Sequence, residues 1–100
     1  MIRHVVMWKF KTEAQGRAKL ENMEILREKL FALPALIPEI KKMEIGFDVK
    51  HTDCSMDFML LTEFDSLDTL AVYAVHPDHL KVTEFVRDVV DTRVVLDCEI

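Results

Sequence analysis

The sequence has few of the features that mark secreted, membrane-spanning or zinc-binding proteins. Its two cysteines, Cys54 and Cys98, lie far apart and form no CxxC pair, so they indicate neither a zinc site nor a disulfide framework. No window approaches the roughly 20 apolar residues of a membrane span. Charges also interrupt the apolar N-terminal stretch MIRHVVMWKF, unlike the core of a signal peptide. We therefore expect free thiols, no membrane partner and a cytoplasmic location.

Runs of positive charge are also missing. Eighteen acidic side chains oppose thirteen basic ones, which gives a net charge of -5, and no basic cluster stands out. Proteins that follow a phosphate backbone need Lys and Arg gathered on one face. We therefore expect no nucleic-acid partner.

Repeats, low-complexity segments and disordered tracts are absent as well. Half of the residues are hydrophobic and 31% are charged, which is the composition of a globular protein. One hundred residues are the size of a single small domain, so we assign residues 1–100 to one domain. A second functional unit would have to come from another copy of the chain or from a partner.

Hydrophobic periodicity predicts the order strand, helix, strand, strand, helix, strand. Apolar residues alternate in the first strand, residues 2–11, and the face that carries Trp8 and Phe10 is apolar except for His4. Apolar residues at helical spacing predict a helix over residues 13–33, which two prolines in LPALIP end. Further along, we predict strands over residues 42–49 and 57–64, a helix over 65–75, a new helical segment over 77–90 and a last strand over 93–100.

This order of elements predicts an α+β fold of the ferredoxin-like βαββαβ type. Its four-stranded antiparallel sheet carries both helices on one face and leaves the other face bare. The third strand is apolar on both faces over residues 58–61, as expected of a strand covered from two sides. We expect Trp8 and Phe10 to form part of an apolar patch on the bare face. Two such faces would then meet and form a homodimer, a dimeric α/β barrel.

Proton-handling side chains gather in the segment AVYAVHPDHLKV, residues 71–82. An imidazole exchanges protons near neutral pH, and a phenol can donate to a developing oxyanion. Pro77 suits the first turn of a new helix, so His76 takes the cap position and His79 is turned in a new direction. The alternative is structural: His76 caps a helix, His79 is a surface residue and Tyr73 packs in the core.

His4 is a second candidate. A single histidine on an apolar strand face is either a hydrogen-bonded core residue or, where that face lines a hollow barrel, a desolvated base. Metal binding is a weaker hypothesis. His76, Asp78 and His79 have side chains that can bind a metal ion, but Pro77 breaks their spacing and no further ligand is visible. We therefore predict no metal site.

The chain resembles the stress-responsive dimeric alpha-beta barrel family, known as Dabb. The resemblance covers nearly the whole chain: RHVVMWKFK, the glycine after an apolar strand, DFMLLTEFDSLDTLAVYAVHPDHLKV, and an arginine followed by a hydrophobic strand that ends in an acid. Its most specific element combines His4 with the tyrosine and HPxH segment at 73–79. In the closing strand, Cys98 follows Asp97 where relatives commonly have a tyrosine.

The resemblance implies a ferredoxin-like subunit that dimerises through its sheet and encloses a cavity. A plant member of the family is a polyketide cyclase. The resemblance to it implies that His79 handles the proton of an intramolecular aldol condensation, that Tyr73 orients or stabilises the carbonyl, and that His4 lines the cavity.

Two hypotheses follow. In the first, the protein is an acid/base cyclase or lyase without a cofactor that acts on a small carbonyl-containing or polyketide-like molecule. His79 is then the base, Tyr73 the donor and His4 their support. In the second, a dimeric binding or stress-protective protein holds a small apolar molecule in the same cavity without converting it.

Overall fold

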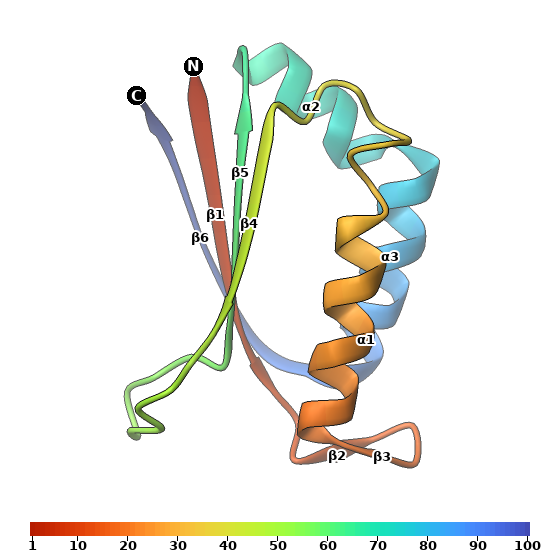
Figure 1. The fold of residues 1–100 in the computed structure, drawn as a ribbon, viewed down its shortest axis with the longest axis vertical. Helices are drawn as coiled ribbons and strands as arrows, with labels where there is room; N and C mark the ends of the chain where they lie inside the picture. The colour runs from red at the N-terminus through yellow and green to blue at the C-terminus, as the bar shows by residue number, and fades with distance from the viewer.

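The computed structural model describes residues 1–100, in which an antiparallel sheet carries helices on one face (Figure 1). The elements are β1 (Ile2–Phe10), β2 (Glu13–Ala14), β3 (Arg17–Ala18), α1 (Lys19–Phe31), β4 (Lys42–Phe47), β5 (Phe58–Phe64), α2 (Leu67–Val75), α3 (Pro77–Val89) and β6 (Val90–Glu99). Four strands form the main sheet in the order β4-β5-β1-β6, and each neighbouring pair is antiparallel. This is the predicted ferredoxin-like α+β fold. None of its helices combines the length and the hydropathy that a membrane crossing requires.

The first helix is shorter than predicted. Residues 13–18 form a small hairpin, β2 and β3, and α1 begins only at Lys19. The two residues between the hairpin strands, Gln15 and Gly16, have φ angles of 57° and 72°. Positive φ at both central positions is the conformation of the type I′ turn, which glycine adopts without steric cost. The prediction of a helix over 13–33 was wrong in its first turns, because apolar spacing does not reveal this turn.

Smaller differences occur at the ends of other elements. The strand predicted over 42–49 ends at Phe47, and the last strand begins at Val90 rather than at Arg93. Helix α3 passes directly into β6, and the backbone N–H of Val90 still donates to the carbonyl of Val86. Val90 therefore ends the helix and begins the strand.

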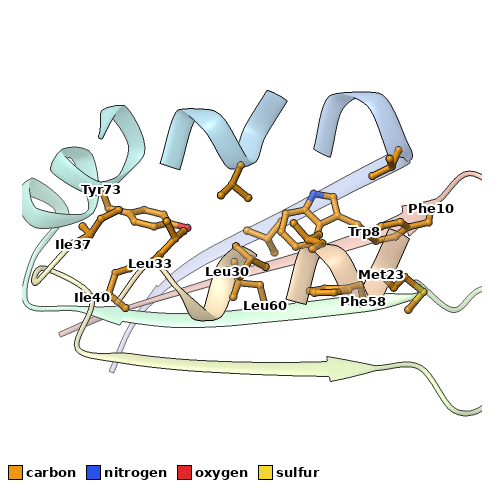
Figure 2. Packing of buried hydrophobic residues seen from close by; sticks show 14 of the residues in the cluster. Trp8, Phe10, Met23, Leu30, Leu33, Ile37, Ile40, Phe58, Leu60 and Tyr73 are labelled. Carbon is orange, nitrogen blue, oxygen red and sulfur yellow. The ribbon is translucent and has the colours of Figure 1, made fainter. Parts of the chain in front are cut away.

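The hydrophobic core lies between the sheet and the helices (Figure 2). From β1 it takes Val6, Trp8 and Phe10, which are 2%, 5% and 3% exposed. Trp8 and Phe10 therefore lie under the helices and not on the bare face, where we had expected them. Both faces of β1 are apolar in its centre, so alternation alone does not tell which face the helices cover.

The bare face carries a different apolar patch, which we call the outer patch. In the register of the sheet, Val5 lies opposite Leu61 and Leu96, and Met7 lies opposite Met59 and Val94. These side chains alternate with the buried ones, so they point away from the helices. Met7, Val94 and Leu96 are 39%, 40% and 63% exposed. The predicted apolar bare face is present, although it is built from other residues.

Candidate functional site

A cavity of about 470 Å³ lies on the helix side of the sheet, between β1, β6 and the helices α2 and α3. Sites for small molecules typically measure roughly 300–1,000 Å³ and are mostly apolar. Nine of the fifteen lining residues are hydrophobic, so this cavity fits that description. All three predicted site residues, His4, Tyr73 and His79, belong to its lining. The cavity lies within one chain, whereas we had expected it between the sheets of two subunits.

Helix α2 positions Tyr73. A capping box begins the helix: the Ser66 hydroxyl accepts from the Thr69 N–H at 3.2 Å, and the Thr69 hydroxyl oxygen accepts from the Ser66 N–H at 3.2 Å. Two turns later Tyr73 faces the sheet and is 2% exposed. Its ring packs against Phe64, with the ring centroids 5.1 Å apart. Figure 2 shows the ring between α2 and the sheet, with its hydroxyl directed away from the helix.

Burial keeps the Tyr73 hydroxyl protonated. Desolvation raises the pKa of Tyr73 to about 12, and the nearby positive charge of Arg93 opposes this only weakly. Desolvation, and not a hydrogen bond, is the cause of the raised pKa. The phenol is therefore a donor at neutral pH and lines the cavity.

A sharp corner between α2 and α3 brings His79 close to Tyr73. Pro77 is the first residue of α3, and proline forces the residue before it into an extended conformation. His76 accordingly has φ -64° and ψ 135° and ends α2. It also caps α3, because the Asp78 N–H donates to its Nδ1 at 3.1 Å. The predicted capping role of His76 is confirmed.

The ring of His79 lies against the ring of Tyr73, with centroids 4.2 Å apart and an angle of 41° between the planes. The Nδ1 of His79 lies 3.1 Å from the carbonyl oxygen of Ala74. A carbonyl can only accept, so Nδ1 carries the hydrogen and donates it. In the neutral ring, Nε2 then holds the free lone pair.

The surroundings of His79 keep this lone pair available. Desolvation is the main cause that lowers the pKa of His79 below its usual value of 6.5, and the hydrogen bond to Ala74 opposes it. The positive charge of Arg93 and the ring of His4 lower the pKa further. His79 is therefore a neutral imidazole at pH 7 and can accept a proton.

His4 meets the site from β1. Its ring is edge-on to Tyr73, with the centroids 6.4 Å apart. On the other side, its Nδ1 is hydrogen-bonded to the Asp97 carboxylate of β6. The two residues lie directly opposite each other in the β1–β6 register. A carboxylate at Nδ1 fixes the orientation and the tautomer of the imidazole.

The lining also contains residues that were not predicted as site residues, among them Asp97, Trp8 and Arg93. Asp97 and Arg93 lie on β6 opposite His4 and Trp8 of β1. Strand alternation places 93 and 97 on one face, but only the pairing register shows that they share a face with His4 and Trp8. No signal within β6 alone would have identified Asp97 and Arg93, whereas alternation in β1 already places Trp8 on the face of His4.

No group of three His, Cys, Asp or Glu side chains is arranged to hold a metal ion. His76 and Asp78, two residues of the weak metal hypothesis, contact each other at the start of α3, with Nδ1 and Oδ2 3.6 Å apart. Neither belongs to the lining of the cavity. The third residue, His79, faces Tyr73 instead.

Residues 2–100 match the family model described as the stress responsive A/B barrel domain, Dabb. The chain belongs to the Dabb family. This confirms the resemblance that the motifs around His4 and Tyr73 suggested. No curated protein matches the sequence of this Dabb domain significantly.

Solved structures with the same fold agree with this assignment. A dimeric protein of unknown function from Bacteroides fragilis is 30% identical, with a TM-score of 0.88 over 99% of this chain and 95% of its own. A dimeric ferredoxin-like protein from Thermobifida fusca is 25% identical, with a TM-score of 0.83 over 99% of this chain and 90% of its own. The hydroxynitrile lyase of Passiflora edulis is 19% identical, with a TM-score of 0.83 over 99% of this chain and 92% of its own, and so shares the fold.

Proposed function

We propose that this Dabb domain is a homodimeric acid/base catalyst that acts on a small carbonyl compound without a cofactor. One observation carries the proposal: Tyr73 and His79 lie with their ring centroids 4.2 Å apart in a mostly apolar cavity. Burial shifts the two pKa values in opposite directions, so the phenol keeps its proton and the imidazole stays free of one. Such a pair supplies a donor and an acceptor at neutral pH.

The pair suits the bond-forming step, an aldol addition, of an intramolecular aldol condensation. Nε2 of His79 removes a proton from a carbon next to a carbonyl group, and the resulting enolate carbon attacks a second carbonyl of the same molecule. The Tyr73 hydroxyl donates its proton to the oxygen on which the negative charge develops. The protonated His79 then returns its proton to the Tyr73 oxygen, which restores both groups.

His4 supports this pair as a positioning residue. Its ring contacts Tyr73 at a centroid distance of 6.4 Å, and the Asp97 carboxylate holds its other edge. The Asp97–His4 pair thus limits the movement of the Tyr73 ring from the sheet side. We assign His4 no proton transfer of its own.

One enzyme among the structural neighbours supports the choice of reaction class. The Passiflora edulis protein is a hydroxynitrile lyase, so the fold can carry lyase chemistry. Its sequence identity of 19% transfers no residue role to this chain. The polyketide cyclase that the sequence resembles points to carbonyl compounds as substrates.

The outer patch supports the homodimer. Neighbours from Bacteroides fragilis and Thermobifida fusca are dimeric and cover 99% of this chain. The outer patch is apolar across β1, β5 and β6, and no helix of its own chain covers it (Figure 1). A surface of this kind on a monomer usually marks a protein interface.

The test of catalysis uses heptane-2,4,6-trione, a β-triketone, and mandelonitrile, a hydroxynitrile. We expect the parent protein to convert at least one of them. Loss of the base in His79→Ala, or of the donor in Tyr73→Phe, should lower kcat about 10²- to 10⁴-fold, the usual contribution of general acid/base catalysis. Lys50→Gln, a change in the exposed β4–β5 connection, is the control and should leave kcat unchanged.

The alternative is a binding or stress-protective protein that holds an apolar molecule in the cavity. The predominance of hydrophobic residues in the lining favours it as the second candidate. It replaces the catalytic proposal if the parent converts neither compound, while the parent, His79→Ala and Tyr73→Phe bind a hydrophobic fluorescent probe equally well.

A further inference from the structure

A hydrogen-bond donor without a partner lies in the wall of the cavity. Trp8 is 5% exposed, and its indole Nε1 is the one buried side-chain polar atom in the protein that lacks a hydrogen-bond partner. Buried donors are nearly always paired, because an unpaired one forfeits its bond to water. Trp8 also lines the cavity. Figure 2 shows its nitrogen on the edge of the ring that faces the helix layer.

The ring of Trp8 is held firmly in this orientation. It packs edge-to-face against Phe58 of β5, with the ring centroids 5.5 Å apart and an angle of 68° between the planes. Val6 and Phe10, its neighbours on the same face of β1, are both buried. The direction of the N–H is therefore fixed, as suits a donor that recognises one acceptor atom.

An arginine lies next to Trp8 on the neighbouring strand. Arg93 of β6 is the partner of Trp8 in the β1–β6 register, so both side chains rise from the same face of the sheet, and both line the cavity. The salt bridges of the protein engage neither Arg93 nor Arg87, the second arginine of the lining. Asp97, the one carboxylate of the lining, is bonded to His4.

We propose that Trp8 Nε1–H and the guanidinium of Arg93 together form an anion subsite that binds the carboxylate of an otherwise apolar ligand. This inference rests on the proposed function for the use of the cavity, and adds the class of ligand. A carboxylate offers several acceptor sites, enough for the indole N–H and the arginine fork at once. The apolar lining holds the rest of the molecule.

The subsite also orients the ligand. Trp8 and Arg93 lie on the sheet, whereas Tyr73 and His79 come from the helix layer. A ligand held by its carboxylate at the sheet presents its apolar or carbonyl-bearing part to the acid/base pair. The carboxylate of the ligand then pairs with the positive charge of Arg93, which forms no salt bridge within the chain.

The test compares the binding of 6-phenylhexanoate with that of 6-phenylhexanamide, its neutral counterpart, by isothermal titration calorimetry. We expect the parent protein to bind the carboxylate at least about tenfold more tightly, as befits a charge-assisted hydrogen bond. Arg93→Gln and Trp8→Phe should each remove most of this preference. Lys50→Gln removes the same charge at an exposed site away from the cavity and should keep it.

A second measurement does not depend on the folding of a variant. Trp8 is the only tryptophan, so the parent protein gives one indole N–H resonance. We expect 6-phenylhexanoate to shift this resonance downfield. The inference is overturned if the amide binds as tightly as the carboxylate, if the preference survives both substitutions, or if the indole resonance stays in place. Because these assays measure binding alone, they can fail while Tyr73 and His79 prove catalytic, and the reverse is equally possible.

Discussion

Burial assigns different roles to the two central residues of the site. Tyr73 and His79 are both desolvated, and desolvation disfavours whichever form of a group is charged. The charged form of tyrosine is the deprotonated one, so its pKa rises. The charged form of histidine is the protonated one, so its pKa falls. One environment thus produces a donor and an acceptor side by side.

The raised pKa of Tyr73 predicts a loss of stability at alkaline pH. The folded-state pKa of about 12 lies above the unfolded value of 10.0, so the unfolded chain loses this proton first. The associated stability is complete below about pH 10 and is lost as the pH rises to about 12, by at most about 2.7 kcal/mol. Urea unfolding at several pH values should show this loss in the parent but not in Tyr73→Phe.

The same group can be observed directly. Tyr73 is the only tyrosine, so the tyrosinate absorbance of the folded protein reports its titration without overlap. We expect this titration to be centred near 12 in the folded protein and to return to about 10 in denaturant. A midpoint near 10 in the folded state would contradict the buried donor.

At the scale of elements, the corner between α2 and α3 builds the site. Pro77 ends one helix and begins the next, and His76 caps both through its backbone and its ring. His79 is then the third residue of α3 and returns toward Tyr73 on α2. A continuous helix would place residues six positions apart on different faces, because a turn takes 3.6 residues.

Substitution of His76 separates capping from chemistry. Asparagine is a good N-cap and alanine a poor one, so we expect His76→Ala to lower the free energy of unfolding by about 0.5–1 kcal/mol and His76→Asn to keep it. His76 does not line the cavity, so His76→Asn should also retain turnover. Urea unfolding and the triketone assay check the two expectations. A large loss of kcat in a stable His76→Asn protein would give His76 a chemical role.

At the scale of the whole molecule, the sheet serves two purposes on its two faces. The inner face carries Trp8 and His4 toward the helices and the cavity. The outer face carries the outer patch, which a second copy of the chain would cover. The inner face is apolar because it faces the helices and the cavity, and the outer face because a second copy of the chain would cover it. The two central strands, β5 and β1, are therefore apolar on both faces.

Adjacent valines on β6 test the interface. Val94 belongs to the outer patch and is 40% exposed, whereas Val95 points to the inner side and is 49% exposed. We expect Val94→Lys to place a charge in the interface and to give the mass of a monomer in light scattering at micromolar concentration. Val95→Lys is the matched control and should remain dimeric. A monomeric parent protein would contradict the dimer outright.

The sequence by itself determined the order of the main elements and the corner at Pro77, and it indicated Tyr73, His79 and His4 as candidate site residues. These features depend on local physical chemistry: alternation, helical spacing, capping and the fixed φ of proline. It also determined the family, through motifs spread along nearly the whole chain. The turn at Gln15 and Gly16 was not predicted, because the spacing of apolar residues does not indicate positive φ angles.

Only the tertiary structure decided which face of β1 the helices cover, and therefore that Trp8 lines the cavity and is absent from the outer patch. It also decided the pairing of β1 with β6, which joins Asp97 to His4 and sets Arg93 beside Trp8. Both outcomes depend on contacts between residues far apart in the chain. An alternating pattern shows that a strand has two faces, but only the register and the packing of the helices select what each face meets.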